Sequence, residues 1–198
     1  YFKNLKETGS VTMVANWNTA NAVLPSVTKD GYSCKYNTKA DGTGTEYAIG
    51  ANYPTSTTGS STTLFVICSA NKYTIGYTMN GGSNPSTKPV EGTYDADVQI
   101  SNPGSKTFTV NIDKNGTGAT VVASVTATQT FKGWTSTTVG SNAKTGTAAN
   151  PSTAWTGTNT KNTYFKNLRE SGTVTMVAYW NAANATLPSV TKDGYTCK

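Results

Sequence analysis

Histidine is absent from this chain of 198 residues, and charged side chains make up only 13% of it. Histidine is the commonest general base and the commonest metal ligand in proteins. Any general base would therefore have to be a Lys or one of the 10 Asp and Glu residues. Asp95 and Asp97 lie on one face of a possible strand and could bind a cation; the alternative is two solvated carboxylates. We expect no enzymatic activity, no catalytic residues, no metal and no cofactor.

Long hydrophobic runs are also missing. No stretch approaches the 18 apolar residues that a membrane-spanning helix needs. The first five residues, YFKNL, have neither an initiating Met nor the apolar centre of a signal peptide. We expect a mature or excised piece of a longer protein, with no membrane contact by this segment.

Positive charge exceeds negative charge, but it is dispersed. The net charge is +6, and none of the 16 Lys and Arg residues neighbours another. Nucleic-acid-binding surfaces usually cluster such residues. The pattern favours a solubilising surface charge and predicts no nucleic-acid partner.

Strand-forming residues are abundant. The chain has 38 Thr and 11 Tyr, and apolar residues alternate over residues 73–79 before an Asn-Gly-Gly turn at 80–82. Residues 63–68 are apolar on both faces, which suggests a central strand. The sequence predicts a mostly β fold with little helix, the one short candidate lying near residues 151–155.

The most informative feature is an internal repeat. Residues 1–35 and 164–198 are identical at 28 of 35 positions, with an offset of 163. Repeats of this kind indicate tandem arrays. We expect one full unit plus the start of the next, taken from a long array in which neighbouring copies are partners.

The substitutions between the two copies mark the faces of a strand. In residues 11–17 and 174–180 every second residue, ending in Trp17 or Trp180, is unchanged, whereas Asn16 becomes Tyr179 on the opposite face. The face that carries the Trp is therefore predicted to point into a core.

Several short motifs together resemble a known family. They are LPSVTKDGY at residues 24–32, TLF at 63–65, YTIGYTMNGG at 73–82, FKGW at 131–134 and VTMVAYW at 174–180. This set resembles the Listeria–Bacteroides repeat, whose extracellular modules are similar to the B repeats of internalin B. The resemblance implies small β-grasp-like modules.

The same resemblance implies a division of the chain. Module one spans residues 18–70, and module two spans residues 71–181 with an inserted hairpin region at 83–130. Residues 1–17 would then be the tail of a preceding module, and residues 182–198 the start of the next module one.

The resemblance also bears on the three cysteines. Cys197 is the copy of Cys34, so one repeat unit contains Cys34 and Cys68. These two stand where the family has a Phe and a Trp, the places that Phe131 and Trp180 occupy in module two. Two core residues in contact are thus replaced by a pair that we expect to form a disulfide, with Cys197 unpaired. The alternative is two buried free thiols. A disulfide would indicate an oxidising, extracellular setting.

Exposed aromatic residues are the candidates for ligand binding. Aromatic rings beside Asn and Asp are typical of carbohydrate sites, although Tyr residues on strands also pack across a sheet. The candidates are Tyr36, Tyr47, Tyr53, Trp155 and Tyr179.

Two functional hypotheses follow. The first is a structural and adhesive repeat of a large bacterial or archaeal cell-surface protein, in which each unit is a rigid bead of a stalk or fibre. The second is a multivalent adhesin module that binds a host or microbial glycan or protein, with avidity from many weak sites.

Overall fold

The computed structural model describes residues 1–3, 8–18, 20–55, 59 and 61–197, and this part of the chain is all β, with no helix. The prediction of a mostly β fold is confirmed. The short helix expected near residues 151–155 is wrong, because Thr153–Ala154 form strand β13, which pairs with β12 (Lys144–Gly146). Pairing with a neighbouring strand here outweighs any local helical preference.

The chain divides into two compact units. Unit 1 comprises Tyr1–Lys29 and Cys34–Ser69, and unit 2 comprises Asp30–Ser33 and Ala70–Lys198.

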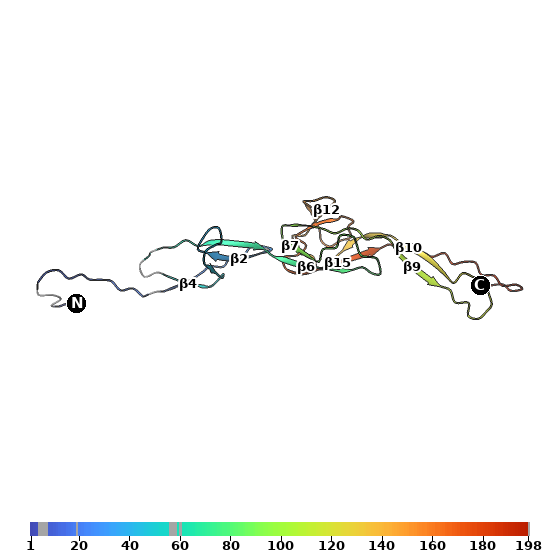
Figure 1. The fold of residues 1–198 in the computed structure, drawn as a ribbon, viewed down its shortest axis with the longest axis horizontal. Helices are drawn as coiled ribbons and strands as arrows, with labels where there is room; N and C mark the ends of the chain where they lie inside the picture. Colours follow the sequence, from blue (N-terminus) through green and yellow to red (C-terminus); the bar gives the residue numbers. More distant parts are fainter. Residues whose placement is uncertain (4–7, 19, 56–58, 60, 198) are drawn as a thin grey trace. The chain divides into compact units, whose positions relative to one another are not determined.

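Unit 1 contains two small sheets (Figure 1). In the first, β1 (Asn21–Val23) pairs antiparallel with β4 (Asn52–Pro54). The second has the order β3 (Glu46–Tyr47), β2 (Tyr32–Asn37) and β5 (Phe65–Ala70). The central position expected for residues 63–68 is therefore wrong, since β5 lies at an edge. Its apolar residues Phe65 and Val66 remain exposed.

The interior of unit 1 is small. Among its described residues the buried apolar side chains are Leu24 and Tyr36, and the polar Asn37 is fully buried beside them. Hydrophobic burial grows with domain size, and units this small usually need a covalent or metal constraint to stay folded.

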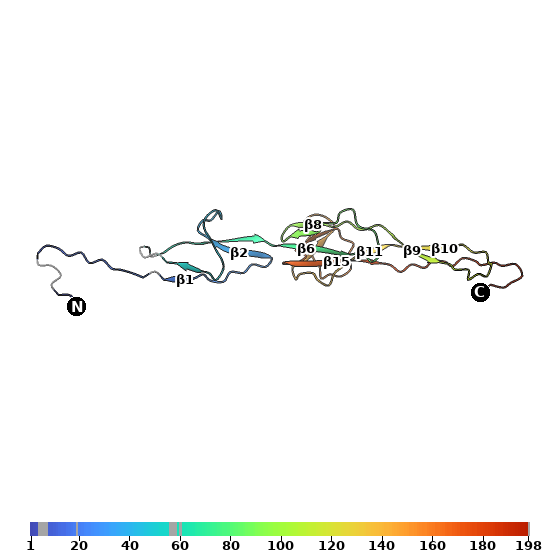
Figure 2. The ribbon, with the colours of Figure 1, turned by 60° about the horizontal axis from the view of Figure 1, so that its bottom comes forward.

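Unit 2 is built on a four-stranded sheet whose order is β11 (Phe131–Thr135), β15 (Gly172–Trp180), β6 (Lys72–Thr78) and β7 (Glu91–Thr93). Strand β15 runs parallel to β6 and antiparallel to β11 (Figure 2). Its alternate residues are buried from Val174 to Trp180, as the comparison of the repeat copies predicts.

A second sheet of unit 2 is wholly antiparallel, with the order β13, β12, β14 (Tyr164–Lys166) and β8 (Asp97–Gln99). One apolar core joins residues from both sheets. It is formed by Tyr73, Ile75, Val98, Ile100, Phe131, Trp134, Trp155, Phe165, Leu168, Val174, Met176, Ala178 and Trp180. Unit 2 thus has a far more extensive interior than the described part of unit 1.

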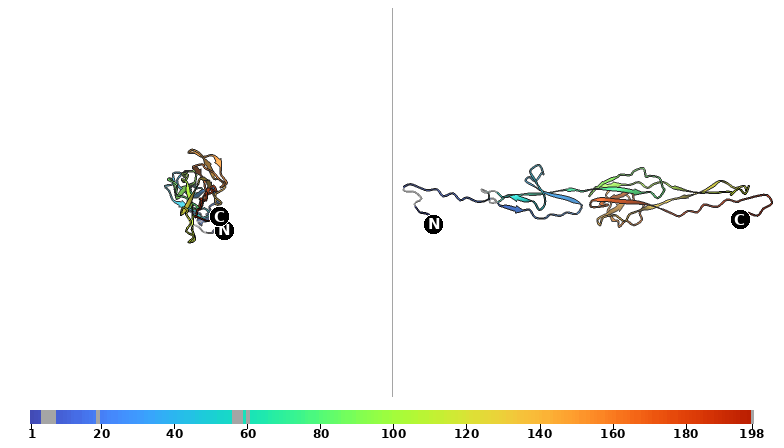
Figure 3. Two further views of the ribbon diagram at one scale, coloured as in Figure 1. Left: turned by 90° about the vertical axis from the view of Figure 1, so that its right-hand side faces the viewer. Right: turned by 90° about the horizontal axis from the view of Figure 1, so that it is seen from below.

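A hairpin extends from unit 2 within the 83–130 region. Strands β9 (Lys106–Asn111) and β10 (Ser124–Gln129) pair antiparallel over six residues each. The C-terminal segment lies beside this hairpin (Figure 3), and Thr191 exchanges backbone hydrogen bonds with Thr120. The tip of the hairpin turns at Asn115, whose N–H donates to Asp113 Oδ1 over 2.8 Å.

The two copies of the repeated sequence adopt different structures. Residues 172–180 form strand β15, but the equivalent described residues 9–17 form no strand and are exposed throughout. The reverse holds at the other end of the repeat. Leu24 is buried in unit 1, whereas its copy Leu187 is exposed.

Candidate functional site

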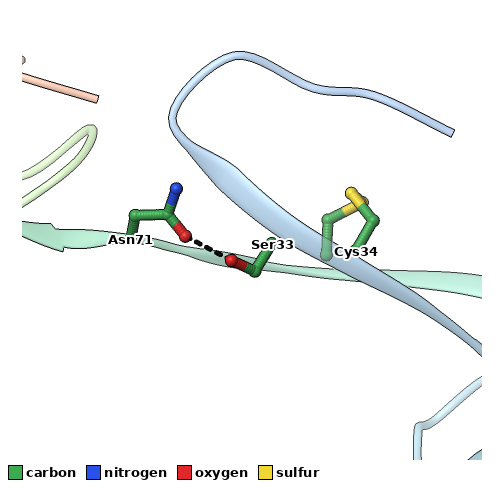
Figure 4. The surroundings of a disulfide bond; sticks show 4 residues. Ser33, Cys34 and Asn71 are labelled. Carbon is green, nitrogen blue, oxygen red and sulfur yellow. Dashed lines mark hydrogen bonds between the residues drawn. A yellow bond between two sulfur atoms is a disulfide. The ribbon is translucent and has the colours of Figure 1, made fainter. Parts of the chain in front are cut away.

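A disulfide joins Cys34 on β2 to Cys68 on β5 (Figure 4), as the family resemblance implies. The pairing is possible because β2 and β5 are hydrogen-bonded neighbours in one sheet, which brings residues 34 positions apart in sequence to adjacent places. Cys197, the copy of Cys34, is free and exposed.

The disulfide closes a covalent ring around most of unit 1. Residues 35–67 lie within this ring and include β3, β4 and half of each of β2 and β5. A pulling force that enters at one end of the chain and leaves at the other crosses directly from Cys34 to Cys68. The residues inside the ring therefore cannot be drawn out, even when their hydrogen bonds break.

Asn37 organises the loop that follows β2. Its Nδ2 donates to the carbonyl of Gly42 over 2.9 Å, and its Oδ1 accepts from the backbone N–H groups of Lys39 and Gly44 over 2.8 and 3.0 Å. At the tip of the same loop, Asp41 accepts two hydrogen bonds from Thr43, and these hold the pKa of Asp41 below its usual value. Asn37 thus fixes the loop from inside, where few apolar contacts are available.

Three of the candidate aromatic residues lie close together in unit 1. Tyr36 faces Tyr47 across β2 and β3, and the rings of Tyr47 and Tyr53 meet edge to face with centroids 5.0 Å apart. Tyr36 is buried and its hydroxyl donates to the carbonyl of Pro25 over 3.0 Å, so the expectation that it is exposed is wrong. Tyr47 and Tyr53 are half-buried and keep part of their rings accessible.

The other two candidates lie in unit 2 and differ from each other. Trp155 is buried against Phe165, with ring centroids 5.0 Å apart, and its Nε1 donates to the carbonyl of Thr158. The expectation that Trp155 is exposed is therefore wrong, because its side chain packs into the core of unit 2. Tyr179 is 55% exposed on β15. It remains accessible, but no other candidate is brought to it.

The carboxylates of Asp95 and Asp97 accept hydrogen bonds from different partners. Asp95 accepts from the Tyr32 hydroxyl over 2.5 Å and from Asn167 Nδ2 over 3.1 Å, whereas Asp97 accepts from the backbone N–H of Asn150. The bond to Asp95 favours the protonated phenol and raises the pKa of Tyr32. These groups hold loops together in unit 2 and do not converge on a shared point.

Asn37 and Asn167 are structural residues that no pattern in the sequence predicted. A signal existed for Asn167, since the polar position is unchanged as Asn4 in the other copy and lies between the apolar Phe165 and Leu168. Asn37 lies outside the repeated segment, and nothing in its neighbourhood distinguishes it from the many other Asn residues.

The surface hollows and the acidic side chains of the described residues were the remaining places where a ligand or a metal ion could bind. Two shallow hollows of about 340 and 310 Å³ in unit 2 are lined by residues 87–99 and 145–162, and neither includes a candidate aromatic side chain. Within the described residues no three Cys, Asp or Glu side chains gather as metal ligands. The same part of the chain contains no helix suited to crossing a membrane.

Comparisons of the chain with protein-family models, with curated proteins and with solved structures each find no match.

Proposed function

We propose that this chain is a structural and adhesive repeat of a long extracellular surface protein or fibre, in which each 163-residue repeat acts as a rigid bead. The observation that carries the proposal is the disulfide between Cys34 and Cys68 in a unit that buries very few apolar side chains. Such disulfides persist in oxidising environments, where small units commonly depend on them.

The repeated sequence supports the same function. Near-identity at 28 of 35 positions separated by 163 residues is typical of arrays, in which successive units provide length. The division into modules 18–70 and 71–181, and their likeness to the β-grasp-like Listeria–Bacteroides repeat, belong to this proposal. The boundary between units 1 and 2 at residues 69 and 70 supports the placement of the first module's end.

Stretching a single molecule tests the proposal. The full chain, with Cys197→Ser to prevent mispairing, is held at its two ends and extended with and without a reductant. We expect unit 2 to unfold in a resolved step, and the fully extended oxidised chain to be shorter than the reduced chain by about 110 Å, the span of the residues within the ring. Equal extended lengths of the oxidised and reduced chains would contradict a mechanical role of the disulfide. Smooth stretching without any unfolding step would contradict the rigid bead.

A second candidate function is a multivalent carbohydrate- or protein-binding module. It is favoured by the edge-to-face pair of Tyr47 and Tyr53, which are partly accessible on β3 and β4. Binding to a glycan array by the wild-type chain, lost in Tyr47→Ser and kept in the control Tyr179→Ser, would support it. An array with no signal for the wild-type chain would leave the structural role as the better reading.

A further inference from the structure

Two turns of unit 2 have the same hydrogen bond and the same central residues. One spans residues 79–82 with Asn80 and Gly81 at its centre, and the other spans residues 114–117 with Asn115 and Gly116. In each turn the N–H of the last residue donates to the carbonyl of the first over 3.0 Å. The central residues all have positive φ, 49° and 81° in the first turn and 48° and 68° in the second. Turns of this kind favour Asn-Gly because few other residues adopt that conformation.

The Asn-Gly pair that such a turn favours is also chemically labile. The backbone nitrogen of the Gly can attack Cγ of the Asn side chain, because a Gly has no Cβ to hinder the approach. A bond forms between that nitrogen and Cγ, the attacking nitrogen loses its proton, and the side-chain nitrogen takes up a proton and leaves as ammonia. Water then opens the cyclic succinimide at either carbonyl, which yields Asp or isoaspartate. The reaction consumes only water.

The first of these turns restrains its Asn through two hydrogen bonds. Asn80 Nδ2 donates to the carbonyl of Ala178 over 2.9 Å, and the carbonyl of Asn80 accepts from Lys106 Nζ over 2.7 Å. The Lys106 side chain also lies over the turn, since a Cβ added at Gly81 would be 3.8 Å from Lys106 Nζ. To bring its Cγ onto the nitrogen of Gly81, Asn80 has to break its bond to Ala178 and turn its backbone against Lys106.

The second turn, at the tip of the β9–β10 hairpin, leaves its Asn side chain unrestrained. Within the described part of the chain the Asn115 side chain makes no hydrogen bond, and the N–H of Gly116 donates none. A Cβ added at Gly116 would meet nothing within 4 Å. Asn80 and Asn115 are both exposed, so access of water does not distinguish the two turns. They differ in the contacts that hold the Asn.

We propose that Asn115 is a site of spontaneous deamidation, at which the folded chain is converted with age to Asp or isoaspartate, and that its contacts protect Asn80 from the same reaction. The product adds a negative charge beside Asp113 to a chain whose net charge is +6. Isoaspartate also carries the main chain through the former side chain, which lengthens the turn and misaligns the bond between Thr117 and Lys114. The inference goes beyond the proposed function and does not rest on it, since it needs only the two turns.

Timed incubation of the full chain tests the proposal. The chain is kept at mildly alkaline pH and physiological temperature, one sample folded and one in denaturant. Peptide mass spectrometry then follows the conversion of Asn80 and Asn115, and chromatography separates isoaspartate from Asp. In the folded sample we expect Asn115 to convert at least about tenfold faster than Asn80, because Asn80 must first give up its hydrogen bonds. In denaturant the two rates should become nearly equal.

Asn115→Gly is the matched variant, because Gly adopts the positive φ of this turn and removes the reactive side chain. After incubation it should keep the hydrogen-exchange protection of β9 and β10, whereas the aged wild-type chain should lose protection near the tip. The proposal is overturned if Asn80 converts as fast as Asn115 in the folded chain, or faster. It is equally overturned if neither converts there while both convert in denaturant, because the turn itself would then protect both.

Discussion

Unit 1 should depend on its disulfide far more than unit 2 does. We consider the pair Cys34→Ser and Cys68→Ser together, in a chain that also carries Cys197→Ser so that no stray thiol can pair. Closing a ring of this size stabilises a fold by about 3–4 kcal/mol in the chain-entropy model. The bridge is the only covalent cross-link among the described residues of unit 1.

The size of the effect follows from how little else holds unit 1 together. Leu24 and Tyr36 are its buried apolar side chains in the described part of the chain. Burying each contributes about 1.5–3 kcal/mol, so the disulfide matches a large share of the hydrophobic stabilisation. The ordering of each backbone residue costs about 1–2 kcal/mol, which leaves little margin. Removing the bridge should therefore unfold unit 1 at room temperature.

Hydrogen exchange resolved along the chain provides the assay. In the double Ser variant we expect amides in β2, β3 and β5 to exchange at the rate of an unfolded chain, while those in β6 and β15 keep their protection. The chain with Cys197→Ser alone is the control and should match the wild type, since Cys197 is exposed and free. Unchanged protection in β2 and β5 would refute the argument that the disulfide compensates for the missing core.

Other substitutions probe single features. Asn37→Ala should destabilise unit 1 by about 1–3 kcal/mol in denaturant unfolding, because the loop carbonyl and N–H groups it binds lose their partner; an unchanged midpoint would contradict this role. Gly82→Ala should destabilise unit 2 by about 1–3 kcal/mol, since the added Cβ would overlap the Trp180 ring, whereas Gly104→Ala meets only Ser83 Oγ at 3.8 Å and should be neutral. Burial raises the pKa of Tyr73 from 10.0 to about 12. The unfolded chain therefore loses this proton first, and the free energy of unfolding should fall between pH 10 and 12. In Tyr73→Phe the free energy of unfolding should fall less steeply over that interval. Identical pH curves for the variant and the wild type would show that Tyr73 is not responsible.

The parts of the fold that the sequence predicted are those with a local pattern. The alternation in residues 73–79 and 174–180 corresponds to β6 and β15, and the Trp face of β15 is buried as the repeat comparison indicates. The disulfide between Cys34 and Cys68 was predicted from the family resemblance. The sequence did not show that Trp155 belongs to the core or that Asn37 is buried, because each depends on neighbours far away in the chain.

The two copies of the repeat separate what sequence determines from what tertiary structure decides. The sequence alone determined a strand-forming segment with one apolar face, and that description holds equally for residues 11–17 and 174–180. Only the tertiary structure decided that Met176 is buried and Met13 is exposed. A strand cannot satisfy its own backbone N–H and C=O groups or cover its own apolar face, so it forms where other strands supply both. Strands β6 and β11 supply both to residues 174–180, whereas residues 11–17 pair with no strand in the described part of the chain.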